Sequence, residues 1–201
     1  MVTESQSDRD QQRFAYPVSL DPRGVPVLVV GGGPVGARKV AGLARAGARV
    51  RLVAREVGDQ IVRRSVFEVH ERDFVPGDLD CVRLVVTATG ITTVDASIAA
   101  AARERGIWVN AADQPDDCDF ILPAVHRSGR VTVAIGTDGA SPALAQWLRD
   151  RVGELLDVHA GGDVAALAEE LSLARDRIRA DGGSTEEVDW SARIESVLSL
   201  P

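Results

Sequence analysis

The sequence predicts an α/β fold built on a parallel sheet, and three observations support this. Apolar strand-like runs alternate with helix-like stretches through the first half of the chain. A glycine-rich turn separates the first strand from the first helix, and a glycine follows each of the two clearest helices. Alternation of this kind favours right-handed crossovers, which place helices against the faces of a parallel sheet. We therefore expect a ligand at the carboxyl ends of the strands.

The first half contains five expected strands and two clear helices. The strands are short runs rich in valine, leucine and isoleucine. The helices end before Gly47 and Gly106, because glycine readily takes the conformation that follows a helix C-terminus. A weaker helical candidate covers 56–64. The predicted strands are Pro26–Val30, Arg49–Ala54, Val66–His70, Val82–Thr87 and Ile107–Ala111, and the predicted helices are Val35–Ala46 and Val94–Arg105.

After about residue 114 this alternation gives way to short strands and a helical module. Two strands are expected around a turn at 127–130. Ser141 is a natural N-cap before Pro142 and predicts the start of a helix. Ser184 and Glu187 resemble a capping box that opens the last helix. The predicted strands are Phe120–Leu122 and Val131–Ile135, and apolar stripes predict helices over 144–155, 164–178 and 190–197, with glycine breaks at 160–162 and 181–183.

Length and composition limit the class of protein. The 201 residues fit one ordinary domain or a domain with a small appendage, and the net charge of −7 argues against a nucleic-acid partner. The two cysteines, Cys81 and Cys118, form neither a metal-ligand spacing nor a plausible disulfide framework, so we expect no metal site and a reducing cytoplasm. No apolar run approaches the roughly 20 residues of a membrane span. The polar residues 1–13 predict a disordered leader.

The turn between the first strand and the first helix is the most informative stretch. Gly31, Gly33 and Gly36 fit the pattern G-x-G-x-x-G. Gly31 allows a tight turn, Gly33 a close approach of the backbone to a pyrophosphate, and Gly36 close packing of helix on strand. The N–H groups at the helix N-terminus favour phosphate. This context predicts a dinucleotide site in a Rossmann-like domain, and a glycine-rich turn without a ligand is the alternative.

Two further loops follow strands at the same edge of the predicted sheet. Thr87, Ala88 and Thr89 follow the fourth strand, where small and hydroxyl side chains suit a ribose or nicotinamide contact. An ordinary turn with capping threonines is the alternative. The loop after the fifth strand carries four carboxylates, among them Asp113. Clustered acids are usually solvated or capping residues, but an acid beside a cofactor is a candidate proton acceptor.

Three motifs in one order resemble the precorrin-2 dehydrogenase module of siroheme synthase. The first is the glycine-rich run Pro26–Lys39. The second runs from Val109–Asp113 through Cys118–Ala124, and the third is Thr137–Ala145. Three motifs in the family's order and spacing are far more specific than one glycine pattern. The resemblance covers about residues 14–156.

The resemblance implies a homodimeric enzyme that oxidises precorrin-2 to sirohydrochlorin with NAD, in siroheme or cobalamin synthesis. It implies an NAD-binding Rossmann-like domain over 14–113, a dimerisation segment over 114–157 and a helical C-terminal domain over 158–201. Some relatives also insert Fe²⁺, so Fe²⁺ is a candidate second substrate. The partner is a tetrapyrrole with several carboxylates, and no membrane or nucleic-acid partner is expected.

The resemblance also assigns roles to individual residues. Asp113 matches the family's essential aspartate, and we expect it to take the proton that leaves during oxidation, or to orient the ring so that it leaves. Pro34 and Val35 match residues that contact the cofactor phosphates. Arg55 and Glu56 fall where the family contacts the adenosine ribose. Because an arginine there also suits a 2′-phosphate, NADP is the alternative cofactor.

The acetate and propionate groups of the substrate need cationic partners. Arginine, lysine and helix N-termini bind carboxylates well. A solvated surface position is the simpler interpretation for each arginine taken alone. The proposed anion partners are Arg38, Lys39, Arg127, Arg130 and the helix N-terminus at Ser141.

Two other functions stay open from the sequence. One is a metallation-only tetrapyrrole chelatase that has lost the oxidation. The other is a non-catalytic nucleotide-binding regulator. The acidic composition and the lack of a basic recognition helix in the sequence count against the regulator, and the loop that carries Asp113 favours chemistry.

Overall fold

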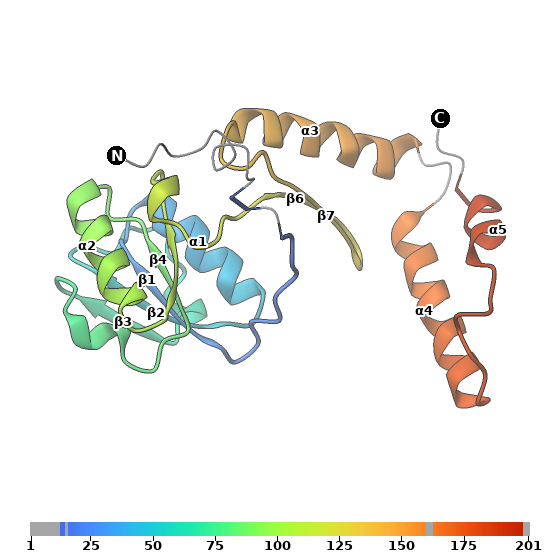
Figure 1. The fold of residues 1–201 in the computed structure, drawn as a ribbon, viewed down its shortest axis with the longest axis horizontal. Helices are drawn as coiled ribbons and strands as arrows, with labels where there is room; N and C mark the ends of the chain where they lie inside the picture. The colour runs from blue at the N-terminus through green and yellow to red at the C-terminus, as the bar shows by residue number, and fades with distance from the viewer. Residues whose placement is uncertain (1–12, 15, 160–162, 199–201) are drawn as a thin grey trace, which may run out of the picture. The chain divides into compact units, whose positions relative to one another are not determined.

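The computed structural model describes residues 13–14, 16–159 and 163–198, which divide into two units, Met1–Leu122 and Pro123–Pro201 (Figure 1). The described part of the first unit holds a parallel sheet, and that of the second holds a hairpin and helices. Apart from Arg13, the leader predicted over 1–13 lies outside the described residues, and so does the predicted break at 160–162.

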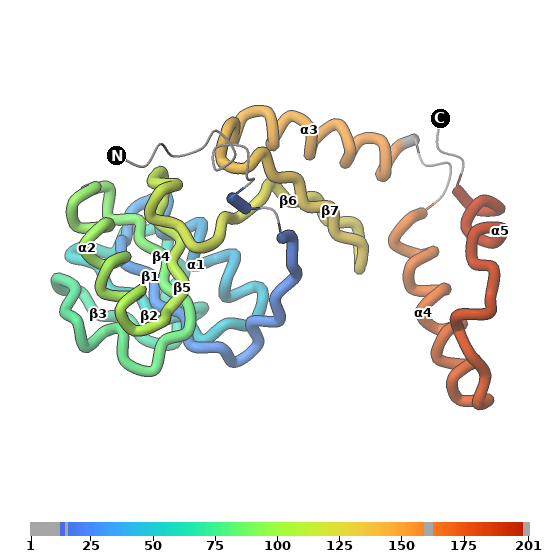
Figure 2. The backbone as a smooth tube through the Cα atoms, in the orientation of Figure 1, coloured from blue at the N-terminus to red at the C-terminus, as the bar shows by residue number. Residues whose placement is uncertain are grey.

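The first unit is a five-stranded parallel sheet in the order β3-β2-β1-β4-β5, which confirms the predicted fold class (Figure 1). Figure 2 traces β5 beside β4 at one edge of the sheet. The strand order reverses between β1 and β4, the position where open α/β sheets bind ligands. The elements are β1 (Pro26–Val30), α1 (Pro34–Arg45), β2 (Arg49–Ala54), β3 (Glu68–Glu71), β4 (Leu84–Thr87), α2 (Thr92–Arg103) and β5 (Trp108–Ala111).

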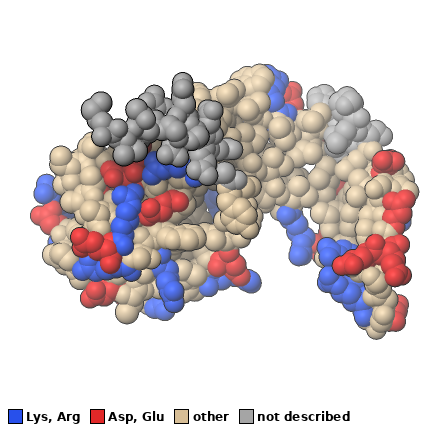
Figure 3. Space-filling model, viewed as in Figure 1, with Lys and Arg blue, Asp and Glu red and all other residues tan. Residues whose placement is uncertain are grey.

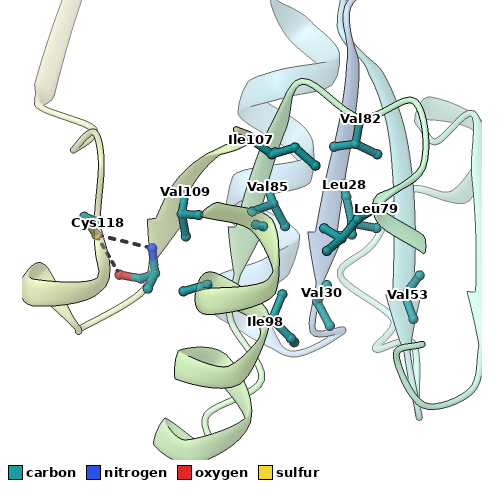
Figure 4. Packing of buried hydrophobic residues seen from close by; sticks show 13 residues of the cluster. Leu28, Val30, Val53, Leu79, Val82, Val85, Ile98, Ile107, Val109 and Cys118 are labelled. Atoms are coloured by element: carbon teal, nitrogen blue, oxygen red, sulfur yellow. Dashed lines mark hydrogen bonds between the residues drawn. The ribbon is translucent and has the colours of Figure 1, made fainter. Parts of the chain in front are cut away.

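Two apolar clusters hold α1 and α2 on opposite faces of the sheet. Alternate side chains of β1 divide between them: Leu28 and Val30 pack with Ile98 of α2, whereas Val29 packs with Val40 of α1. Figure 4 shows the α2 cluster, with Leu28 and Val30 directed toward Ile98. Burying such a side chain contributes about 1.5–3 kcal/mol. The sheet is therefore covered on both faces. At the carboxyl ends of its strands, where we expect the ligand, the surface is formed by loops.

Both predicted glycine stops are confirmed. Gly47 has φ +88° and Gly106 has φ +68°, in the left-handed region that glycine enters without a steric penalty. The N–H of Gly47 donates to the carbonyl of Ala44 (N···O 3.0 Å), which closes the last turn of α1. The chain then enters β2.

The weaker helix expected over 56–64 is wrong. The chain forms an irregular segment there, followed by a short 3₁₀ turn at Arg63–Ser65. The N–H of Gly58 donates to the carbonyl of Gly32 (3.1 Å), and Ile61 is buried in the cluster beneath α1. Because these tertiary contacts use the backbone and the apolar side chain, they override the local helical preference.

The second unit begins with an antiparallel hairpin of β6 (Ala124–Ser128) and β7 (Val131–Ile135). The position of β7 is as predicted, but the strand expected over Phe120–Leu122 is wrong. The N–H of Phe120 donates to the carbonyl of Val109 (3.4 Å), and the carbonyl of Phe120 accepts from the amide of Asn110 (3.0 Å). That segment is therefore tied to β5 in the first unit and is not part of the hairpin.

Two long helices follow the hairpin. The first, α3 (Pro142–Glu154), begins as predicted at Ser141, whose hydroxyl accepts from the N–H of Leu144 (3.2 Å). One turn of π-helix (Leu155–His159) extends it. The second, α4 (Val164–Ala180), is capped by the carboxylate of Asp163. Both helices are where the apolar stripes predict them.

The last helix, α5 (Trp190–Glu195), begins later than the predicted capping box. Asp189 is its N-cap and accepts from the N–H of Ser191 (3.0 Å). Ser184 instead accepts from the N–H of Glu186 (3.2 Å), which makes a tight turn. The indole of Trp190 then donates to the carbonyl of Thr185 (3.0 Å) and fixes that turn outside the helix.

Replacing Ile98 by alanine tests the core. Ile98 is fully buried between α2 and the sheet, so its removal leaves a cavity and should lower the free energy of unfolding by about 2–5 kcal/mol. Val62→Ala is the control, because that side chain is exposed and its change should stay within about 0.5 kcal/mol. Urea unfolding followed by circular dichroism measures both. Equal effects of the two variants would contradict the packing described.

Candidate functional site

The glycine-rich turn makes backbone contacts that no side chain would permit. Gly31 has φ +121°, and a Cβ atom there would lie 2.2 Å from the carbonyl oxygen of Ala88. A Cβ at Gly32 would lie 2.0 Å from the carbonyl oxygen of Glu56, and one at Gly36 would lie 2.0 Å from that of Gly31. Since heavy atoms do not approach so closely, the turn joins the ends of β1, β2 and β4 only because glycine occupies these positions.

The open side of the glycine-rich turn, at the N-terminus of α1, is suited to a dinucleotide phosphate. Gly33 is exposed, and a Cβ atom there would meet no described atom within 4 Å, so this side of the turn is open. Gly33 is the N-cap of α1, Pro34 is at the first helical position, and no acidic residue occupies the first turn. The N–H groups and dipole of this helix end therefore face a space suited to an anion. Val35 is half-buried beside it.

The end of β2 carries the residues predicted to contact the adenosine ribose. The Nε of Arg55 forms an ion pair with Asp73, and the pKa of Arg55 is raised mainly by that hydrogen bond. Glu56 is exposed, and its carbonyl is the one that faces Gly32. The guanidinium expected to be available for a 2′-phosphate is thus engaged with a carboxylate.

The loop after β4 is held by a buried aspartate. Asp95, in the first turn of α2, is 2% exposed and accepts from both the N–H (3.2 Å) and the hydroxyl (2.9 Å) of Thr89. Ala88 donates its N–H to the carbonyl of Val30 (2.7 Å), which fixes it against β1. Thr87 is fully buried, and its hydroxyl is without a hydrogen-bond partner among the described residues.

Three of the four carboxylates in the loop after β5 are paired. Asp116 lies 3.4 Å from a guanidinium nitrogen of Arg13. Asp117 and Asp119 both pair with Arg103, at 3.5 and 3.1 Å. Asp119 also accepts from the N–H of Val109 (2.9 Å). Asp117 and Asp119 therefore fasten the loop to Arg103 of α2, whereas the carboxylate of Asp116 is fully exposed.

Asp113 is the exception in this loop. It is exposed, and in the part of the chain that the structure describes its carboxylate has no hydrogen bond or ion pair. Its φ of +60° is in the left-handed region, which aspartate tolerates better than most residues. Such backbone strain persists only where surrounding contacts enforce it, and it is common at functional sites. The arrangement leaves Asp113 available to accept a proton.

Lys39 and Asn110 form a partly buried polar contact near this loop. Asn110 pairs in register with Val86, so its side chain points to the α1 face of the sheet. There its Oδ1 accepts from the Nζ of Lys39 (3.0 Å). Burial lowers the pKa of Lys39, the positive charge of Arg38 lowers it further, and the negative charge of Asp113 partly offsets these shifts. The lysine predicted to bind substrate thus lies within electrostatic reach of Asp113.

Cys118 closes the loop from inside. Its thiol accepts from the N–H of Ala111 and donates to the carbonyl of the same residue, both at 3.2 Å (Figure 4). Burial raises the pKa of Cys118, so the thiol stays protonated at neutral pH. Cys118 therefore has a structural position, and it brings the two ends of the loop together around Asp113.

The remaining predicted anion partners divide between the units. Arg38 on α1 is exposed, and no hydrogen bond or ion pair of its guanidinium is found within the described segments. In the second unit, Arg127 donates to the hydroxyl of Thr132 (3.1 Å) and Arg130 pairs with Glu169 (3.5 Å). Ser141 is engaged as the N-cap of α3. Their roles toward a substrate stay predictions.

Four residues of this edge were not predicted from the sequence, namely Arg13, Asp95, Asn110 and Cys118. The sequence could have indicated Asn110, because it is the polar residue in the otherwise apolar strand Trp108–Ala111. It indicated Asp95 more weakly, because an acid in the first turn of a helix often binds nearby N–H groups. The contacts of Arg13 and Cys118 depend on how distant segments pack.

A metal site and a membrane-spanning helix each place requirements on the described residues. No group of three or more His, Cys, Asp or Glu side chains there is arranged to hold a metal ion. Of the helices that the structure describes, none has the length and apolarity needed to span a bilayer. On the face drawn in Figure 3, acidic and basic side chains lie interspersed.

Comparison with known proteins agrees with this geometry. Residues 18–124 match the family described as "Putative NAD(P)-binding". The chain is 40% identical over 166 residues to siroheme synthase of Methylococcus capsulatus, which covers 81% of this chain and 34% of that protein. It is 40% identical over 155 residues to siroheme synthase 1 of Yersinia enterocolitica, covering 76% and 33%. The chain therefore spans about a third of the length of these curated relatives.

One solved structure matches nearly the whole chain. It is titled "SirC, precorrin-2 dehydrogenase", with a TM-score of 0.65 and 28% sequence identity. The match covers 90% of this chain and 86% of that one. Together with the siroheme synthases, it confirms the resemblance predicted from the three motifs.

Gly36→Ala tests the turn geometry. The added Cβ would lie 2.0 Å from the carbonyl oxygen of Gly31, so the turn must shift and the free energy of unfolding should fall by about 1–3 kcal/mol. Gly42→Ala on the same helix meets no described atom within 4 Å and should gain up to about 1 kcal/mol from helix propensity. Urea unfolding compares them. A neutral Gly36→Ala would show that helix and turn are not in close contact.

Proposed function

The chain belongs to the NAD(P)-binding family, and on that premise we propose that it oxidises precorrin-2 to sirohydrochlorin with NAD as the hydride acceptor. The observation that carries the proposal is Asp113, the loop carboxylate left without a hydrogen bond or ion pair within the described segments. It follows β5 at the same sheet edge as the glycine turn. The likeness to a precorrin-2 dehydrogenase over most of the chain supports this reaction.

The residues divide the chemistry between binding and proton transfer. A bound nicotinamide supplies the hydride acceptor. The glycine turn and the α1 N-terminus would hold the pyrophosphate, with Pro34 and Val35 beside it at the start of the helix. Oxidation of the macrocycle releases one hydride and one proton, and the carboxylate of Asp113 takes the proton or orients the ring so that the proton leaves. The protein's contribution is therefore placement and one base.

The ion pair of Arg55 supports NAD over NADP. A 2′-phosphate needs a cation at the end of β2, and the guanidinium there is already bound to Asp73. Glu56 is the nearby carboxylate available for the ribose hydroxyl groups. Thr87, Ala88 and Thr89 are proposed to contact the cofactor from the β4 loop, with Ala88 and Thr89 positioned by backbone and Asp95 contacts.

Asp73→Asn should weaken the preference for NAD. The change leaves Arg55 without its partner, and because an exposed ion pair is weak, NADP affinity should rise only about two- to fivefold. Titration by intrinsic fluorescence measures the dissociation constants of both nucleotides. Arg55→Ala should not show this rise in NADP affinity. An unchanged NADP affinity in Asp73→Asn would show that the ion pair of Arg55 does not determine the choice between NAD and NADP.

We propose candidate cations for the acetate and propionate groups of the tetrapyrrole in each unit, taken separately. Arg38 and Lys39 extend from α1 next to the glycine turn, and Arg127, Arg130 and the N-terminus at Ser141 are the candidates in the second unit. Each fits an acetate or propionate by charge. Arg38 requires no loss of an existing hydrogen bond or ion pair in the described chain, which favours it among the arginines.

We extend the proposal to Fe²⁺ insertion as a second step. Insertion requires the macrocycle N–H protons to leave, and the carboxylate of Asp113 suits that task as well. Fe²⁺ is then a substrate that enters the product ring. Adding Fe²⁺ anaerobically after the oxidation tests this step, since the siroheme spectrum must replace that of sirohydrochlorin faster than in a protein-free control.

A homodimer in the cytoplasm completes the proposal. Leu144 and Trp147 of α3 are large apolar side chains that are about half exposed, and a two-stranded hairpin is marginally stable without further packing. A second copy that covers this unit would bury them. Light scattering after gel filtration gives the mass of the assembly.

The proposed cytoplasmic location agrees with the cysteines. Cys81 and Cys118 are both free, as expected in a reducing compartment.

Asp113→Asn is the direct test of the catalytic role. Losing the base should lower kcat for precorrin-2 oxidation by about 10²- to 10⁴-fold, with NAD affinity unchanged. Asp116→Asn is the matched control, because that loop carboxylate is fully exposed and should retain activity within about twofold. The assay follows the sirohydrochlorin spectrum anaerobically with enzymatically made precorrin-2 and NAD⁺.

The outcomes separate the candidate functions. Full activity in Asp113→Asn would remove Asp113 from the reaction. No oxidation by the unmodified protein with NAD⁺ or NADP⁺ would reject the dehydrogenase and leave a metallation-only chelatase or a regulator. Failure to bind either nucleotide would reject the dehydrogenase and the regulator together.

A further inference from the structure

The guanidinium of Arg13 binds the main chain of the loop that carries Asp113. Its Nη1 donates to the carbonyl of Pro115 (2.9 Å). Its Nη2 donates to the carbonyls of Asp116 and Cys118, both at 3.0 Å. Three carbonyls that face one side of the loop thus share one cation, which comes from more than 100 residues earlier in the sequence.

These carbonyls belong to the first and second residues of a short 3₁₀ turn, Pro115–Asp117, and to its C-cap, Cys118. The carbonyl of Pro115 also accepts the N–H of Cys118 (3.0 Å) within the turn, whereas carbonyls at the end of a turn lack such partners and carry partial negative charge. A planar guanidinium satisfies several of them at once in a fixed geometry. Arg13 therefore fixes the turn that begins two residues after Asp113.

The position of Asp113 requires such a constraint. Its left-handed φ of +60° is less favourable than extended backbone. The thiol of Cys118 fastens the inner side of the loop to Ala111. Arg13 fastens the outer side. Together these contacts prevent the loop from relaxing and moving the carboxylate.

We propose that Arg13 is a positioning residue, which holds the 113–118 loop so that the carboxylate of Asp113 stays at the reacting ring. This rests on the proposed oxidation of precorrin-2. The contribution comes from the carbonyl contacts, because the ion-pair partner Asp116 is fully exposed and such pairs add little. Arg13 belongs to neither apolar cluster, and its contact with the α2 cluster is indirect, through the ring of Phe14 (5.2 Å from the guanidinium carbon to the ring centroid).

Arg13→Ala should lower kcat about tenfold, since a small displacement of a catalytic group is enough for such a loss. NAD affinity should stay within about twofold, because the glycine turn is untouched. Arg105→Ala is the matched control: that guanidinium also donates to a main-chain carbonyl, that of Ala101 (2.9 Å), but on α2. Millimolar guanidinium chloride should restore part of the activity that Arg13→Ala loses. It should leave the activity of Arg105→Ala unchanged.

A double-mutant cycle with Asp113→Asn decides how Arg13 acts. If Arg13 acts through Asp113, adding Arg13→Ala to Asp113→Asn should change the residual rate less than twofold. Additive losses, or full activity of Arg13→Ala, would overturn the proposal, because Arg13 would then contribute only general stability or nothing.

Hydrogen exchange separates this proposal from the proposed reaction. In Arg13→Ala, amides of 111–118 should exchange about tenfold faster while those of 26–40 stay unchanged. If the unmodified protein does not oxidise precorrin-2, the proposed function fails, and unchanged exchange in 111–118 independently rejects the clamp by Arg13. Faster exchange in both segments would also reject it, since the effect would then be global.

Discussion

Backbone contacts that exclude every side chain hold the carboxyl edge of the sheet together. Gly31 lies against the carbonyl of Ala88 and Gly32 against that of Glu56, so the ends of β1, β4 and β2 meet at one turn. The same turn leaves Gly33 and the start of α1 open. The open start of α1 and the packing of the neighbouring loops thus have one origin, and both depend on residues without a Cβ atom.

Charge is distributed so that one carboxylate in the acidic loop is left unpaired in the described chain. Arg13 and Arg103 neutralise the structural acids of the loop after β5. Lys39 satisfies the buried amide of Asn110 and stays close enough to interact with Asp113. A buried polar group without such partners would cost about 1–3 kcal/mol. The pairing that stabilises the loop is therefore also what distinguishes Asp113.

Local signals predicted much of the fold because the relevant contacts are local. The helix stops at Gly47 and Gly106 and the cap at Ser141 depend on conformations within a few residues. The helix expected over 56–64, the strand over 120–122 and the cap at Ser184 were wrong for the opposite reason. In the first two of these segments, hydrogen bonds to distant parts of the chain replace the local preference, whereas the indole of Trp190 and the cap at Asp189 move the start of the last helix.

The sequence by itself determined the parallel α/β class and the glycine turn, and its resemblance to a known family gave the prediction that Asp113 is essential. Only the tertiary structure decided which carboxylates are paired, that Arg55 is bound to Asp73, and that Asn110 and Cys118 support the loop. The physical reason is range. The alternation of apolar residues and the spacing of glycines depend on residues that are close in the sequence. An ion pair or a buried hydrogen bond instead joins groups that only the completed fold brings within 3–4 Å.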